Sequence, residues 1–356
     1  MVEQKLSRLA FLLPAIASLI IGVVTGLSRT SIDIFNTLSP LGGLHSIFMI
    51  SGFFGTVISL ERAVAIQKKW PYFASVFSAL GGLALTSTMT APFSPVLLCA
   101  ASAIFCCSNA VVALRHPALH TRLLLVAALL WLLGNLSWLI FDSAWVSIPY
   151  GLSFLVLTIA AERLELTRFL PTPISAKWVF IVLTGLTLLG TGVSATTNFF
   201  DNRLLGSSYA LLSIWLIRFD IAKKTISQKG VTRFVAVCLL SGYFWLLVGG
   251  LLLSNLFDIG PFQRDAGIHG IALGFIFSMV IGHAPVIFPA VLRASIPYSP
   301  FFYIPWTLIQ VGTATRFAAA ALSNPVYRSV GAVISALAIV SFFFIMARQA
   351  IRGARK

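Results

Sequence analysis

The stretch DAGIHGIALGFIFSMVIGHAPVIFP, residues 265–289, is apolar over most of its length and yet carries two histidines, His269 and His283. As a helix it is long enough to cross a bilayer, which takes about 20 apolar residues. The histidines are 14 residues apart, which on a helix places them about 21 Å apart along the axis and within about 40° of one face. Pro285 and Pro289 are expected to kink or end the helix just after His283. Ionisable side chains are costly inside a membrane, so such histidines commonly have a function.

The rest of the chain shares this apolar character. Of its 356 residues, 58% are hydrophobic and 10% are charged, whereas a typical soluble protein has about 25% charged residues. The apolar runs are long and do not alternate with polar residues, so they predict membrane-spanning helices and not the strands of a barrel. We therefore expect an all-α, polytopic membrane protein with a single integral membrane domain over residues 1–356.

Apolar windows predict twelve spans. The first is interpreted as a retained helix and not as a signal peptide, because its apolar stretch runs for about 19 residues, longer than the core of a usual signal peptide. The windows lie near 9–27, 41–60, 72–90, 95–114, 122–140, 145–163, 177–197, 204–221, 233–255, 266–288, 299–321 and 328–348.

The basic residues predict the orientation. The net charge is +15, but Lys and Arg fall in short clusters between the windows, which is typical of cytoplasmic loops and not of a nucleic-acid-binding domain. With the N-terminus inside and twelve spans, most basic residues lie on the inner side. We expect an inner-membrane protein with both termini in the cytoplasm and no nucleic-acid partner. Only five of the 25 Lys and Arg then lie on the outer side: Arg29, Arg203, Arg264, Arg316 and Arg328.

A short motif recurs four spans apart. GTVISLERAVAI ends the second window and LVLTIAAERLEL ends the sixth, so Glu61-Arg62 and Glu162-Arg163 both fall at the inner face. His283 falls at a comparable depth in the tenth window. The spacing suggests three pseudo-symmetric four-helix units. Chance recurrence of Glu-Arg at a charged membrane boundary is the alternative.

Two histidines share an outer depth. His45 lies about one turn inside the outer end of the second window, and His269 lies about one turn inside that of the tenth. Neutral imidazole is a common axial ligand of haem iron, and facing helices of a bundle can hold a cofactor between them. Arg264 and Arg316, near outer helix ends, could pair with haem propionates. The alternative is that each imidazole forms a hydrogen bond with a neighbouring helix.

His283, Glu61 and Glu162 define a second candidate site at the inner side. Together these side chains could bind a divalent metal or relay protons. The carboxylates could equally form ion pairs with Arg62 and Arg163. The residues leave all three interpretations open.

The motifs resemble a known group of proteins. LHSIFMISGFFGTVISLERAVAI, LTIAAERLELTR and IHGIALGFIFSMVIGHAPVIFPAV resemble twelve-helix bacterial and archaeal membrane proteins similar in layout to the NnrS family. NnrS proteins contain haem and copper and are linked to nitric oxide stress. The resemblance to subunit I of haem–copper oxidases is more distant. The resemblance as a whole covers all twelve spans in layout, with motifs in the second, sixth and tenth. It implies a haem b held by His45 and His269.

The chain also departs from the oxidase pattern. Oxidases carry copper-binding histidines on helices 6 and 7, whereas windows 145–163 and 177–197 contain no histidine, and position 267, two residues before His269, is glycine. A copper centre is therefore not supported, and no catalytic residue is assigned. The resemblance implies a haem b protein for electron transfer or nitric oxide and small-gas handling, with a redox partner or membrane complex. A cofactor-free transporter and a structural subunit of a membrane complex are the alternatives.

Overall fold

The computed structural model describes residues 2–30, 32, 36–197, 201–257, 259–292 and 295–354, and no strand occurs among them. The all-α prediction is therefore confirmed for this part of the chain. Two compact units are present, and each is described by itself. The first comprises Met1–Ala161 and Ser194–Phe199, and the second comprises Glu162–Val193 and Phe200–Lys356.

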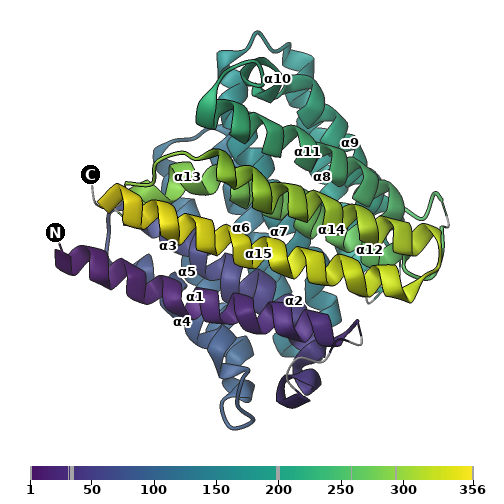
Figure 1. The fold of residues 1–356 in the computed structure, drawn as a ribbon. Coiled ribbons are helices and arrows are strands. Elements are labelled where there is room, and N and C mark those ends of the chain that lie inside the picture. Colours follow the sequence, from purple (N-terminus) through teal and green to yellow (C-terminus); the bar gives the residue numbers. More distant parts are fainter. Residues whose placement is uncertain are drawn as a thin grey trace. The chain divides into compact units, whose positions relative to one another are not determined.

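The first unit is built from six long or composite helices (Figure 1). The helix that carries His45 is continuous but changes type along its length, from 3-10 through a short α segment to a π segment and back to α. The elements are α1 (Val2–Ser28), η1 (Asn36–Leu44), α2 (His45–Ile47), η2 (Phe48–Gly55), α3 (Thr56–Ile66), α4 (Tyr72–Ala84), η3 (Ala91–Phe93), α5 (Ser94–Arg115), α6 (Leu119–Phe141) and α7 (Ala144–Leu166), whose last residues belong to the second unit.

The second unit contains the other histidine helix. Here α14 and α15 pack side by side, as do α9 and α11 (Figure 1). The elements are η4 (Thr167–Phe169), α8 (Ile174–Thr196), α9 (Arg203–Phe219), α10 (Ala222–Thr225), α11 (Gly230–Leu253), α12 (Gln263–His269), η5 (Gly270–Phe277), α13 (Ser278–Leu292), η6 (Pro300–Phe302), α14 (Tyr303–Ala321) and α15 (Pro325–Ala354).

Several of these helices can cross a bilayer. In the described part of the chain, eight are long and apolar enough by length and composition, and Leu12–Ser28 and Tyr72–Ala84 are shorter apolar helices. The protein is therefore a membrane protein with several apolar helices, and each of the twelve predicted windows overlaps helical structure. The eight are Leu38–Ile66, Ala91–Arg115, Leu119–Phe141, Ala144–Phe169, Ile174–Thr196, Gly230–Leu253, Gln263–Pro289 and Pro325–Gly353.

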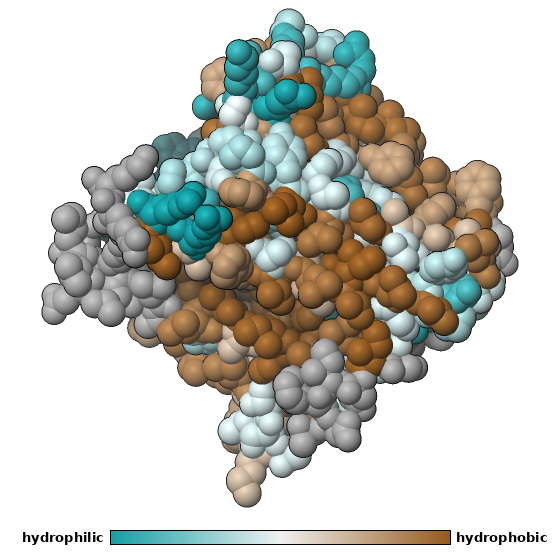
Figure 2. All heavy atoms as spheres, in the orientation of Figure 1, coloured by the Kyte–Doolittle hydropathy of each residue, from teal (hydrophilic) through white to brown (hydrophobic). Residues whose placement is uncertain are grey.

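Apolar side chains also cover the outside of the helices. Hydrophilic residues gather over α10, whereas most of the other coloured surface in the same view is apolar (Figure 2). On α15, Leu337, Val340 and Phe344 are 55%, 65% and 69% exposed. Their three- and four-residue spacing gives one apolar helix face. Such a face is suited to contact with lipid.

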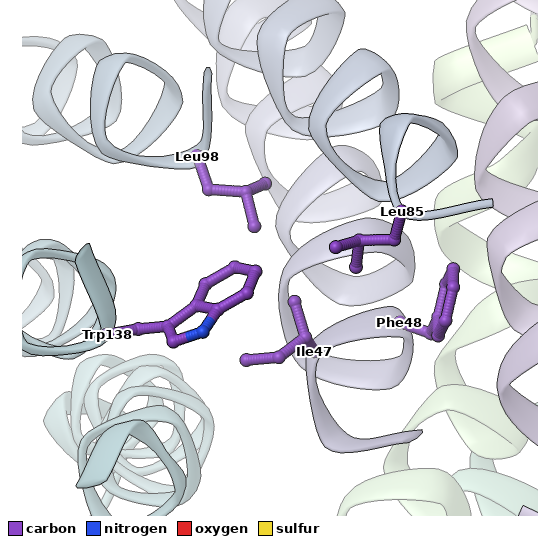
Figure 3. Packing of buried hydrophobic residues seen from close by; sticks show 5 residues of the cluster. All are labelled: Ile47, Phe48, Leu85, Leu98 and Trp138. Atoms are coloured by element: carbon purple, nitrogen blue, oxygen red, sulfur yellow. The ribbon is translucent and has the colours of Figure 1, made fainter. Parts of the chain in front are cut away.

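A tight cluster fixes the His45 helix within the first unit. Ile47 and Phe48, which follow His45, pack with Leu85, Leu98 and Trp138, all buried (Figure 3). These side chains come from the His45 helix, the end of α4, α5 and α6. Large buried side chains packed from four elements leave little freedom for the backbone.

The tenth window forms one continuous helix that passes through its prolines. The helix α13 extends to Leu292, with Pro285 and Pro289 inside it. The prolines therefore do not end the helix just after His283, whereas the alternative expectation of a kink there stays a prediction. In a membrane protein, neighbouring helices can satisfy the backbone groups that a proline releases.

Candidate functional site

The His45 ring is held against α1 by a hydrogen bond to the backbone of that helix. Its Nδ1 lies 2.6 Å from the carbonyl oxygen of Gly22. A Cβ atom at Gly26 would lie only 2.7 Å from Cε1 of the His45 ring, so the ring fits only because residue 26 is glycine. A carbonyl oxygen can only accept, so Nδ1 carries a proton.

His269 makes the same kind of Nδ1 hydrogen bond in the second unit. Its Nδ1 lies 2.8 Å from the carbonyl oxygen of Asp265, one turn earlier. The Asp265 carboxylate is also near, with Oδ1 at 3.5 Å from Nδ1. Histidines that bind metals usually donate the other ring N–H to a carbonyl or carboxylate, which orients the ring. Both imidazoles therefore make the kind of Nδ1 hydrogen bond that orients a metal-binding histidine.

A π-helical segment follows each of these histidines. In the described residues, π-helix occurs in two eight-residue segments, η2 three residues after His45 and η5 directly after His269. Each packs against the helix before it and the helix after it: η2 against α1 and α4, and η5 against α11 and α14. The π-helix is rare and frequent at functional sites. The two histidine helices therefore share an unusual local architecture that α7, in the sixth window, lacks.

Side chains fix the η2 segment. Ser51 donates to Oδ1 of Asn135 at 3.2 Å, and the indole N–H of Trp131 donates to the Ser51 hydroxyl at 3.0 Å. The Ser51 carbonyl accepts from the Ser78 hydroxyl at 2.6 Å. Asn135 also donates to the Leu98 carbonyl at 3.1 Å. The π segment is thus joined to α4, α5 and α6.

A similar set of side chains borders η5. The indole N–H of Trp245 on α11 donates to Oε1 of Gln310 on α14 at 2.6 Å. Gln310 in turn donates to the hydroxyl of Ser278, the first residue after η5, at 2.9 Å. A tryptophan, a carboxamide and a serine therefore form a chain of hydrogen bonds at both π segments.

Arg316 and Arg264, the two arginines predicted to pair with propionates, differ in their surroundings. Arg316 is 6% exposed, and its Nη1 donates to Oδ2 of Asp265 at 2.8 Å. Arg328 approaches the other oxygen of the same carboxylate, with Nη2 at 3.4 Å from Oδ1. Arg264 is exposed. Sequence reasoning missed Asp265, although its spacing four residues before His269 was a readable signal.

The inner candidate residues do not all lie in one unit. Glu61 on α3 belongs to the first unit, whereas Glu162 and His283 belong to the second. Within the described residues, no group of three or more His, Cys, Asp or Glu side chains could hold a metal ion. A site shared by Glu61, Glu162 and His283 therefore stays a prediction.

The neighbours of His283 within its own unit were not predicted. His283 Nδ1 lies 2.8 Å from the Met279 carbonyl oxygen, so this Nδ1 also carries a proton. Arg163 interacts electrostatically with His283, and also with Asp220 and Tyr243. Asp220 follows α9 directly, and Tyr243 lies within α11, so only their polar character in apolar surroundings could have marked them.

The family match covers nearly the whole chain. No curated protein and no solved structure matches it. A family model described as a domain of unknown function (DUF8744) matches residues 8–351. This range includes both histidine helices, both π segments and the residues around His283. The chain therefore belongs to the DUF8744 family.

Proposed function

We propose that this protein is a haem b-binding membrane protein, in which His45 and His269 would hold the haem, and that it transfers electrons or handles a small gas such as nitric oxide. The observation that carries the proposal is the pairing of each histidine with a π segment. Each imidazole also donates its Nδ1–H to a backbone carbonyl, which is the bond that usually orients a metal-binding histidine. The resemblance to the NnrS family stays a prediction that agrees with this role.

The surroundings of each histidine support a role in holding haem. Bound haem would supply an iron that changes oxidation state or binds a gas. The chain's own part is to orient the rings, through the Gly22 and Asp265 carbonyls, and to keep water away with buried apolar side chains such as Phe48 and Ile271. Because the histidines belong to different units, their approach to one iron is itself part of the proposal.

Arg316 has fewer N–H groups to offer to a haem propionate than the sequence suggests. Asp265 already holds one terminal nitrogen of Arg316. Among the described residues Nε of Arg316 has no hydrogen-bond partner, so this N–H is what Arg316 could offer to a propionate. Arg264, which is exposed, is the other candidate.

The topology completes the proposal. Twelve spans in three pseudo-symmetric four-helix units, in an inner membrane and with both termini cytoplasmic, would make the His45 helix second in the first unit and the His269 helix second in the third. The shared π segments and the shared packing against preceding and following helices support this equivalence. A copper centre is not part of the proposal.

An absorption spectrum tests the haem. Full-length protein purified in detergent from haem-supplied cells should show a Soret band that shifts on reduction with dithionite. His45→Ala and His269→Ala should each lose most of this band, while His116→Ala, at an exposed position after α5, should retain it. Folded, monodisperse protein without a Soret band would overturn the proposal and favour a cofactor-free transporter or a structural subunit.

A further inference from the structure

Four polar side chains of the second unit are linked electrostatically, because Arg163 interacts with Asp220, Tyr243 and His283. Arg163 comes from the last turn of α7, Asp220 follows α9, Tyr243 lies on α11 and His283 lies on α13. Arg163, Asp220 and Tyr243 are only 8%, 3% and 0% exposed. Buried polar groups are normally hydrogen-bonded. Hydrogen-bond partners are therefore expected for these four side chains.

Three polar atoms in this cluster lack a partner. Oδ1 of Asp220 accepts from the Ala222 N–H at 2.7 Å and so caps α10. Oδ2 of Asp220, the hydroxyl of Tyr243 and Nε2 of His283 are buried and have no hydrogen-bond partner within the described residues. The Tyr243 hydroxyl lies beside the Asp220 carboxyl group, close enough to interact with it. Leaving such atoms unsatisfied is costly, and a molecule from outside the chain would give all three of them a partner.

The polarity of these atoms defines that partner. Nε2 of His283 accepts while the imidazole is neutral, and Oδ2 of Asp220 accepts while Asp220 is a carboxylate, so the partner must be able to donate twice. Tyr243 and the nearby Arg163 guanidinium can donate to it. A cation would be repelled by Arg163, and an anion would be repelled by the Asp220 carboxylate. A water molecule has two donors and two acceptors, and buried waters typically make about three hydrogen bonds to polar groups of this kind.

We propose that Asp220, Tyr243 and His283 hold a buried water molecule that passes protons between the Asp220 carboxyl group and the His283 imidazole. Protonated Asp220 gives its proton to the water oxygen, while the water gives one of its own protons to Nε2 of His283. Asp220 becomes a carboxylate, His283 becomes an imidazolium, and the water is regenerated. No oxidant or reductant takes part.

The surrounding charges make this a relay. The positive charge of Arg163 stabilises the Asp220 carboxylate and repels a proton on His283, so the imidazolium is short-lived. On α11, the helix packed against α13, Tyr243 and Cys238 are titratable, and the Cys238 thiol packs against Gly282, next to His283 in the sequence. Neither carries a charge that would hold the proton on His283. Asp220, next to the basic α10 segment, is the end of the path nearer to the predicted cytoplasmic side.

Infrared difference spectroscopy in ¹⁸O-labelled water tests the water itself. The full-length protein should show an O–H stretching band of a bound water that shifts in the labelled solvent. Asp220→Asn, Tyr243→Phe and His283→Gln should each remove the band, although the asparagine side chain still offers an oxygen to cap α10. Tyr327→Phe, at a tyrosine that is 43% exposed, is the matched control and should retain it. An absent band, or one that survives all three substitutions, would overturn the proposal.

A pH titration of the same samples tests proton transfer. The carbonyl stretch of protonated Asp220 should appear on acidification and be missing in Asp220→Asn. Its midpoint should shift in His283→Gln, because the two groups exchange a proton through the water. An unchanged midpoint would refute the relay. These readouts do not require haem, so they are independent of the proposed function and remain informative if no Soret band is found.

Discussion

The Asp265 carboxylate balances most of the buried charge near His269. It accepts from Arg316 at 2.8 Å and lies 3.4 Å from Arg328, so it joins α12 to α14 and α15. It also lies 3.5 Å from Nδ1 of His269. Two guanidinium groups share one carboxylate, and removing that carboxylate leaves positive charge with little compensation.

Asp265→Asn should therefore be strongly destabilising. Breaking a buried ion pair by removing one partner typically costs 3–5 kcal/mol, and we expect about 3 kcal/mol because Asp265 is 19% exposed. The measurement is the free energy of unfolding in detergent. Glu165→Gln is the control: its 3.7 Å contact with Arg168 joins side chains that are 40% and 63% exposed, so it should cost less than about 1 kcal/mol. Equal effects of the two substitutions would contradict this account.

At the residue scale, the sequence indicated the candidate histidines but not the side chains that interact around them. His45, His269 and His283 stand out because imidazoles are rare in apolar helices, and the Asp265–His269 spacing fits one helical turn. Arg316 follows Asp265 by 51 residues, and its choice of partner depends on how α14 packs. Asp220 and Tyr243 also come from separate elements, so their proximity depends on helix packing in the same way. Whether His45 and His269 bind haem stays a prediction.

At the element scale, the π segments place side chains that an α-helix would not. In η5, Gly274 packs against Trp245, whose indole N–H donates to Gln310. A Cβ atom at position 274 would overlap Cβ and Cγ of Trp245 and lie 2.8 Å from its Cδ1. At Gly270, in the same segment, the nearest atom would be the Cα of Gly249 at 3.4 Å. Two glycines of one π segment therefore differ sharply in the space around them.

This contrast predicts different outcomes for two identical substitutions. Gly274→Ala should displace Trp245, break its bond to Gln310 and cost about 1–3 kcal/mol, as overpacking does. Gly270→Ala should be neutral or stabilise by about 0.5 kcal/mol, because alanine loses less conformational entropy. Thermal unfolding followed by tryptophan fluorescence compares them. A Gly270→Ala variant as unstable as Gly274→Ala would show that the packing around Trp245 is not the cause.

The apolar pattern predicted where helices lie but not their type. Each predicted window overlaps helical structure because apolar length alone favours a helix in lipid. The π segments depend on bonds from residue i to i+5 and on outside partners such as Ser78 and Asn135, which no local periodicity reveals. Pro285 and Pro289 likewise left two local outcomes open, a kink or an end, and the end does not occur because their helix continues to Leu292.

At the scale of the whole molecule, α4 is the critical element for the number of spans. It has 13 residues, or about 20 Å at 1.5 Å per residue, whereas the hydrocarbon core is about 30 Å thick. A short helix can still cross where the bilayer thins or flanking residues extend it. The next helix, Ala91–Arg115, has 25 residues and is long enough on its own.

Cysteine labelling on either side of α4 distinguishes the two cases. In a background without the four native cysteines, Lys68→Cys and Met89→Cys flank α4, and both positions are exposed. If α4 crosses as the twelve-span topology requires, a membrane-impermeant maleimide should label position 89 on intact cells and position 68 only after permeabilisation. His116→Cys, at the far end of α5, is the control and should behave like position 68. Labelling of 68 and 89 from the same side, with 116 on the other, would mean that α4 does not cross and that every later span is inverted.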